Sequence, residues 1–262
     1  MTWMMRSRLL LQFWSVLAIA LAACSVSPPV PGLSMAAQHS LAEAMTEEGN
    51  DNAALHLLRA SAQRTPDDAL AQERYGLAAE RARLYSEALA ALDRAVQVGG
   101  PIPARLVEQG RIALEAGDMP AAVQAYTRAL EREPANISAL NGLGVAEDLQ
   151  RRHAEAQAHY REALRLAPND WGIRNNLALS LLMSGRAGQA CEVLADAATD
   201  PAAPRQARHN LGLALVAAGK REDAIRVLRI DTPAPEAAAM ADEFATFARW
   251  LASPEATTPL RP

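Results

Sequence analysis

The feature that most constrains this chain is an internal period of 34 residues, repeated six times without an insertion. The twentieth position of every block is alanine, and the eighth is glycine or alanine. A period of this length is typical of a helical solenoid, in which each unit buries its apolar face only by stacking on its neighbours. The blocks are 35–68, 69–102, 103–136, 137–170, 171–204 and 205–238.

Each block predicts two helices of about 13 residues joined by a tight turn. Small residues at the eighth and twentieth positions let the two backbones approach, and larger ones such as Leu143 and Tyr160 fill the seam. Glycine tolerates the left-handed backbone of a helix C-cap, so the first helix should end at the fifteenth position. Arg83 stands there in the second block. Glycine occupies it as Gly49, Gly117, Gly185 and Gly219.

These columns resemble the tetratricopeptide repeat, most clearly in residues 137–170, and the likeness covers 204 of the 262 residues. The resemblance implies an all-α fold, a tetratricopeptide-repeat superhelical solenoid of six 34-residue helix-turn-helix repeats plus a C-terminal capping helix. The sixth block breaks after Ile230, and an apolar stripe then predicts the capping helix within 236–252. A partner-binding helix is the alternative there. The proline-rich tail, 253–262, is expected to be disordered.

The N-terminus predicts a signal sequence that directs the protein to a membrane. Residues 1–23 place two arginines before a 15-residue apolar stretch, which rises only about 22 Å as a helix. That length favours a signal peptide over an uncleaved anchor. Residues 21–24, L-A-A-C, resemble a bacterial lipobox, which implies lipidation of Cys24. Residues 24–34 then predict a proline-rich tether from the lipidated Cys24. Ser25 favours the outer membrane. We therefore expect a lipid-anchored protein on the outer membrane that faces the periplasm of a Gram-negative bacterium.

Composition and motifs point away from several function classes. A formal charge of −4 argues against a nucleic-acid partner. The five histidines form no metal-ligand pattern, no cofactor motif follows a strand, and no nucleophile–base arrangement is recognisable. We therefore predict no enzyme, no metal and no cofactor, with a site hidden at the C-terminal cap as the alternative.

The resemblance places the first helix of each repeat on the concave side. The first three blocks offer mainly acidic residues to this groove: His39, Glu43, Glu47, Glu73, Glu80, Arg111 and Glu115. In some tetratricopeptide proteins, asparagine at the sixth position clamps the backbone of an extended peptide; here the alternative is hydrogen bonding between helices. The predicted partner-binding residues are Asn141, Asn175, Asn176, Leu179, Met183, His209, Asn210 and Leu213.

Residues 171–244 resemble the C-terminal half of the TadD lipoproteins of the tight-adherence (Flp) pilus. The likeness rests on N-N-L-A-L-S at 175–180, a proline-containing spacer at 201–204 and R-x-N-L-x-L at 208–213. It implies an adaptor that helps to localise or assemble the Tad/Flp pilus machinery, with the secretin or another pilus-assembly component as partner. Other envelope adaptors fit the same features: a type IV pilus pilotin, a cell-wall hydrolase scaffold or a component of outer-membrane protein insertion.

Overall fold

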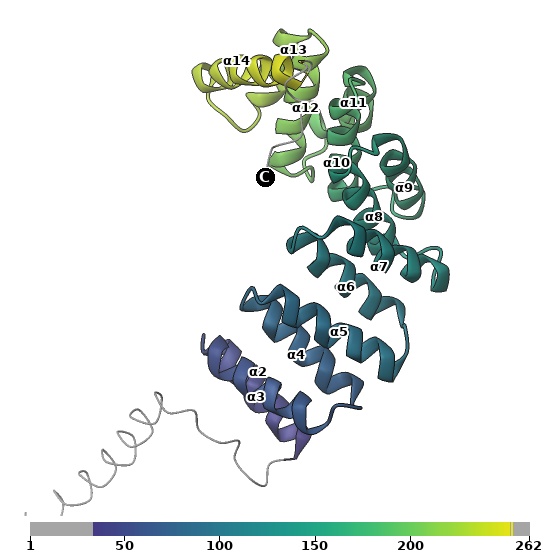
Figure 1. The fold of residues 1–262 in the computed structure, drawn as a ribbon. Coiled ribbons are helices and arrows are strands. Elements are labelled where there is room, and N and C mark those ends of the chain that lie inside the picture. Colours follow the sequence, from purple (N-terminus) through teal and green to yellow (C-terminus); the bar gives the residue numbers. More distant parts are fainter. Residues whose placement is uncertain (1–33, 252, 254–262) are drawn as a thin grey trace, which may run out of the picture.

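The computed structural model describes residues 34–251 and residue 253. Within this part, the chain forms thirteen α-helices, labelled α2 to α14, and one 3-10 turn, with no strand. Successive helices pack side by side and build a curved stack that is open on one side (Figure 1). The predicted all-α solenoid is thereby confirmed. The predicted signal peptide, Cys24 and residues 254–262 lie outside the described residues.

The first helix of every repeat has 13 residues and begins at the first residue of a 34-residue block. Most of these helices are capped by a polar side chain; for example, Asp68 and Asp170 accept hydrogen bonds from backbone N–H groups of the first turn. The six first helices are α2 (Met35–Glu47), α4 (Ala69–Arg81), α6 (Pro103–Glu115), α8 (Ile137–Leu149), α10 (Trp171–Met183) and α12 (Arg205–Ala217).

The second helices differ in length from the expected value. Helices α11 and α13 have only 8 residues each. After α11 the chain tightens into a 3-10 turn, η2 (Ala195–Ala198), because the N–H groups of Thr199 and Asp200 both bond to the Asp196 carbonyl. The second helices are α3 (Asp51–Arg64), α5 (Tyr85–Gly99), α7 (Met119–Arg132), α9 (His153–Leu166), α11 (Ala187–Leu194) and α13 (Arg221–Leu228).

The turn between the two helices of a repeat has one backbone shape in all six copies. The fifteenth residue has φ between +58° and +77° in every repeat, which is the left-handed region. The four glycines expected there adopt it freely. Arg83 and Arg151 adopt it as well, with φ of 58° and 62°, although side chains disfavour it.

Ring-against-glycine packing sets the distance between paired helices in the middle repeats. A Cβ atom added at Gly144 would lie 2.6 Å from the Tyr160 ring, and one at Gly110 would lie 2.7 Å from the Tyr126 ring. Both rings are buried, at 1% and 3% exposure. Glycine at the eighth position therefore makes room for the large side chain at the twenty-fourth.

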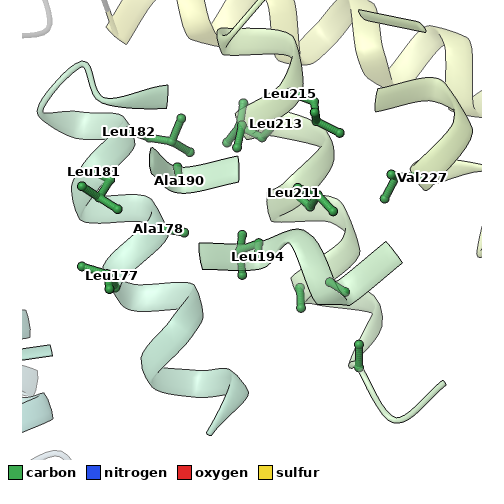
Figure 2. Close-up of a cluster of buried hydrophobic side chains, with 14 of the residues drawn as sticks. Leu177, Ala178, Leu181, Leu182, Ala190, Leu194, Leu211, Leu213, Leu215 and Val227 are labelled. Carbon is green, nitrogen blue, oxygen red and sulfur yellow. The ribbon is translucent and has the colours of Figure 1, made fainter. Parts of the chain in front are cut away.

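The largest core lies in repeats four to six. The leucines labelled in Figure 2 come from α10, α11 and α12, and Val227 comes from α13. Helix α14 (Ala234–Leu251), which begins two residues before the expected capping helix, packs on α12 and α13. Ala237 and Ala241 are fully buried there, and Phe244 packs against the same core. The last repeat is thus covered by an apolar helix face.

Candidate binding groove

The predicted groove lies on the first helices of repeats four to six. In Figure 1, α8, α10 and α12 lie nearer the open side of the stack than α9 and α11. These helices are adjacent, because α10 contacts both α8 and α12. Side chains at equivalent positions of the three helices therefore form rows that cross the repeats.

Four of the predicted asparagines form two matching pairs across neighbouring repeats. Asn176 Nδ2 donates to Asn141 Oδ1 at 2.9 Å, and Asn210 Nδ2 donates to Asn175 Oδ1 at 3.0 Å. In each pair, the fifth residue of one repeat accepts from the sixth residue of the next. The asparagines therefore join neighbouring helices, which is the alternative interpretation, and they carry amide groups beyond these bonds. The peptide clamp stays a prediction.

The Asn141–Asn176 pair keeps hydrogen-bonding capacity beyond its own bond. Within the described part of the chain, neither Asn141 Nδ2 nor Asn176 Oδ1 has a hydrogen-bond partner of its own, and both side chains are half-buried. One donor and one acceptor side by side match the N–H and C=O of a peptide unit. Asn175 is only 6% exposed, so it supports the row from below.

An open cleft of about 310 Å³ lies along this row. It runs between the starts of α8, α10 and α12, and its lining is mostly polar. Sequence reasoning found three of its residues and missed the rest, because a polar residue at the start of a helix is ordinary in any helical protein. The cleft is lined by Ile137, Ser138, Asn141, Asp170, Gly172, Ile173, Asn175, Asn176 and Gln206.

Of the predicted apolar residues, some reach the surface and one is buried. Met183 is 44% exposed and Leu179 is half-buried, so both reach the surface of α10. Leu149, on α8, is 59% exposed at the position equivalent to Met183. Leu213 is different: it is 7% exposed and belongs to the core of repeats four to six. The structure therefore places Leu213 in the interior rather than in an open groove.

His209 lies at the polar end of α12, half-buried, where its Nε2 is 3.2 Å from Arg205 Nε. Burial, together with the neighbouring Arg205 charge, lowers the pKa of His209 below its ordinary value. The ring is thus favoured in its neutral form, with Nε2 as the acceptor facing Arg205. It adds no positive charge to the groove near neutral pH.

The acidic half of the groove is partly neutralised by arginine. Arg111 forms ion pairs with Glu80, Glu108 and Glu115, all within 3.3 Å. Arg105 pairs with Glu73 at 2.7 Å. Three carboxylates around one guanidinium still leave a negative surface. The predicted His39 is 5% exposed and so does not contribute to it.

A partly buried polar network joins α8, α9 and α10. Asp148 Oδ1 accepts from Ser180 Oγ at 2.7 Å and lies 2.7 Å from His153 Nδ1. Gln157 donates to Ser184 at 2.9 Å and accepts from Arg186 at 3.0 Å. Ser180 and His153 thus share one carboxylate. The network joins helices.

Searches of the described residues for other kinds of site add two findings. No group of three or more histidine, cysteine or acidic side chains is placed to hold a metal ion. No helix in that same part of the chain is long and apolar enough to cross a membrane. The row of asparagines with its cleft is therefore the candidate site that the geometry supports.

Comparison with known proteins identifies the family. The tetratricopeptide repeat profile matches residues 40–101, 107–170 and 150–207, which together make up more than half of the chain. The chain belongs to the tetratricopeptide repeat family. Proteins of this family are typically non-catalytic scaffolds for protein interactions, so this chain has the fold of a protein-binding adaptor.

Individual proteins match this chain only over a short segment or at low sequence identity. The uncharacterized protein y4yS of Sinorhizobium fredii is 38% identical over 68 residues, which are 26% of this chain and 37% of that protein. The chain thus spans little more than a third of this relative. Pseudomonas aeruginosa pilF has a TM-score of 0.61 at 17% identity, over 80% of this chain and 96% of its own. A Parabacteroides merdae repeat protein has a TM-score of 0.61 at 15% identity, over 84% and 86%. These structures share the fold.

Proposed function

We propose that this protein is a non-enzymatic lipoprotein adaptor of the bacterial outer membrane. It binds a segment of a partner protein in the groove of repeats four to six. Through that contact it assists assembly or localisation of the Tad/Flp pilus machinery, with the secretin as the partner. The observation that carries the binding step is the pair of asparagine bridges, Asn141–Asn176 and Asn175–Asn210, beside an open polar cleft.

The chemistry of the groove supports a polypeptide ligand. The free donor and acceptor of the Asn141–Asn176 pair are complementary to a main-chain amide, whatever side chains the ligand has. YrrB, described as a TPR protein with an unusual peptide-binding site, has the same fold, with a TM-score of 0.56 at 17% identity. The pilus assignment rests on the resemblance of residues 171–244 to the TadD lipoproteins.

The test is mild cross-linking in the native host, capture of the lipoprotein and mass spectrometry of what is retained. It compares the wild type with an Asn176→Ala, Asn210→Ala variant. The control replaces Asn52, an exposed asparagine of α3 that lies outside the groove of repeats four to six. We expect the secretin or another pilus-assembly protein with the wild type and the control, and its loss from the groove variant.

Two outcomes contradict parts of the proposal. Recovery of peptidoglycan enzymes or of outer-membrane insertion subunits in place of pilus proteins would refute the pilus role. Equal recovery of the secretin by the wild type and the groove variant would refute the asparagine row as the contact.

Membrane attachment is tested separately through Cys24. Thioether lipidation needs the cysteine sulfur, so Cys24→Ser should move the protein from the membrane fraction to the soluble periplasmic fraction. Replacement of the half-buried Cys191 by serine is the control, and it should leave fractionation unchanged. A membrane-bound Cys24→Ser protein would contradict lipid anchoring at this residue.

A further inference from the structure

The first helices of repeats four to six and helix α14 all end at one edge of the stack. The starts of α8, α10 and α12 line a single cleft, so their other ends lie at the opposite edge. Helix α14 runs in the same direction as α12, because Asp231, which precedes α14, pairs with Arg208 in the first turn of α12. We call this the basic edge, and it comprises residues 149–154, 183–188, 217–222 and 244–251.

The basic edge is positive on a chain whose formal charge is −4. Six of its residues are arginine or lysine, and one, Glu222, is acidic. The same positions of repeats one to three, 47–52, 81–86 and 115–120, have two basic and five acidic residues. Cations suit the C-terminal end of any helix, yet these N-terminal repeats have mainly acidic residues there. The helix dipole therefore does not account for the basic residues of repeats four to six.

Three of the basic side chains are available to a partner. Arg186, Lys220 and Arg249 are exposed, and none of the three forms an ion pair within the described part of the chain. Among the same described residues, the exposed carboxylates that flank the edge without an arginine partner are Glu155 and Glu243. The positive charge is therefore not neutralised within the molecule.

Large apolar side chains are exposed along the same edge. Leu149 and Met183 are the last residues of α8 and α10, and they are 59% and 44% exposed. Phe247 and Trp250 are 44% and 48% exposed and stack on each other at 5.6 Å. Helix α14 has 18 residues against 13 in each first helix, so these two rings lie past the part of α14 that corresponds to a first helix. The apolar side chains thus reach solvent beside the cations.

This combination fits the surface of an anionic bilayer better than an acidic protein. Aromatic rings are favoured at the depth of the lipid head groups, and arginine and lysine are attracted to the anionic lipids beside them. Cations alone would suit either partner. The exposed Phe247–Trp250 pair also provides apolar rings that can enter the head-group region.

We propose that the basic edge rests on an anionic lipid bilayer, with Phe247 and Trp250 among the head groups and the cations on the lipid phosphates. The inference rests on the proposed function in one respect, because lipidation of Cys24 brings the stack to a bilayer. Repeat one and α14 lie at opposite ends of the stack (Figure 1), so the two contacts lay the stack along the membrane. The polar cleft, at the opposite edge, then faces away from the lipid.

The experiment reconstitutes the full-length protein with vesicles of phosphatidylcholine, alone or with about one third phosphatidylglycerol, whose acyl chains are brominated to quench tryptophan. In one protein, Trp3, Trp14 and Trp171 are replaced by phenylalanine, so that Trp250 is the only tryptophan. In a second protein, Trp171 is kept and the other three are replaced. Trp171 begins α10, at the opposite edge, and is the internal control. Flotation confirms that each protein is on the vesicles.

Charge reversal separates the basic edge from the rest of the surface. The test variant combines Lys220→Glu with Arg249→Glu. The matched control combines Arg132→Glu with Arg161→Glu, since both residues are exposed on second helices, α7 and α9, and the change in net charge is the same. Circular dichroism verifies that both variants keep the helical fold.

We expect loss of Trp250 emission in the brominated anionic vesicles. The loss should be small in neutral vesicles, and also at about 1 M NaCl, where charges are screened. Trp171 emission should stay unchanged. The Lys220→Glu, Arg249→Glu variant should no longer show quenching of Trp250, and the control should retain it.

Unquenched Trp250 in protein that floats with the anionic vesicles would overturn the inference, and an acidic protein partner would give this result. Equal quenching of Trp250 and Trp171, or of the two charge-reversed proteins, would also overturn it, because the contact would not depend on the edge. A dimer in detergent that Phe247→Ser dissociates would do the same, since a second copy would cover the rings. None of these readouts involves the asparagine row or a captured partner, so the proposed groove can hold where this inference fails.

Discussion

At the scale of the residue, the fifteenth position of each repeat has a left-handed backbone, but two repeats have no glycine there. All six copies adopt a positive φ, yet Arg83 and Arg151 carry side chains there. A left-handed backbone costs a residue with a Cβ atom about 1–2 kcal/mol in the folded state. Glycine avoids this cost, but its unfolded chain has greater conformational freedom, which offsets part of the gain in stability.

Arg83→Gly should therefore stabilise the protein by about 0.5–1 kcal/mol. Arg83 is exposed with φ of 58°, so the gain arises from the backbone. The reverse change, Gly117→Ala, should cost about 1 kcal/mol, although a Cβ at Gly117 meets nothing within 4 Å. Urea unfolding followed by circular dichroism measures both. A loss of stability in Arg83→Gly would contradict the strain argument.

Glu147 is a second residue whose environment conflicts with its charge. It is 6% exposed, its Oε2 has no hydrogen-bond partner, and His159 Nε2 lies 3.5 Å from that oxygen. Burial raises the pKa of Glu147 to about 6, opposed by Arg152 and reinforced by Glu155 and Asp148. Burial also lowers the pKa of His159, so the histidine is a weak counter-ion near neutral pH.

The sign of the resulting pH dependence follows from the raised pKa. Protonated Glu147 is favoured in the folded state, so its ionisation destabilises the fold increasingly as the pH rises from about 4.5 through about 6. Glu147→Gln should stabilise the protein by about 1–2 kcal/mol at pH 8 and by much less at pH 4.5. Replacement of the exposed Glu131 is the control. Equal effects at both pH values would refute the buried-charge account.

At the scale of the element, only part of the apolar stripe of α14 is buried against the last repeat. Phe244 packs on the core of repeats four to six, whereas Phe247 is 44% exposed and stacks on Trp250 at 5.6 Å. The two phenylalanines lie on one helix, less than one turn apart, and so form a natural comparison. Phe244 covers the last repeat, whereas Phe247 presents its ring to solvent.

Phe244→Ala should cost about 2 kcal/mol, because it removes a partly buried ring from the cap of the last repeat. Phe247→Ala should cost less than about 1 kcal/mol, since it loses one stacked contact at the surface. Thermal unfolding of both variants makes the comparison. A larger loss for Phe247→Ala would show that the outer face of α14 holds the repeat.

At the scale of the whole molecule, stability is distributed unevenly along the stack. The core of repeats four to six with α14 contains 24 buried apolar residues, while the cluster that begins in α2 and α3 contains 9. Repeats that contact mainly their neighbours behave as coupled units rather than as one cooperative body. The N-terminal repeats should therefore open first.

Hydrogen exchange monitored by mass spectrometry tests this expectation. Amides of α2 and α3 should exchange faster than those of α10 and α12, which lie in the larger core. Leu55→Ala, which removes a buried side chain from the smaller cluster, should speed exchange in α2–α5 and leave α10–α13 unchanged. Uniform acceleration along the chain would show that the stack unfolds as a single unit.

The groove could be predicted only in part. The positions of Asn141, Asn176 and Met183 follow from the period, because a fixed residue number per repeat fixes the face of the helix. That the asparagines bond to each other depends on how far one repeat is shifted against the next. Leu213 was expected in the groove with Leu179, but it lies inside the core of repeats four to six, with α14 packed on its helix.

The sequence by itself determined the number of repeats, the first residue of every first helix and the left-handed turn in the four repeats that have glycine at the fifteenth position. These features are local, since they depend on residues within one 34-residue block. Only the tertiary structure decided which asparagines pair, that Gly172 lines an open cleft, and that Leu213 is buried. Those outcomes depend on contacts between helices of different repeats, whose spacing no single block encodes.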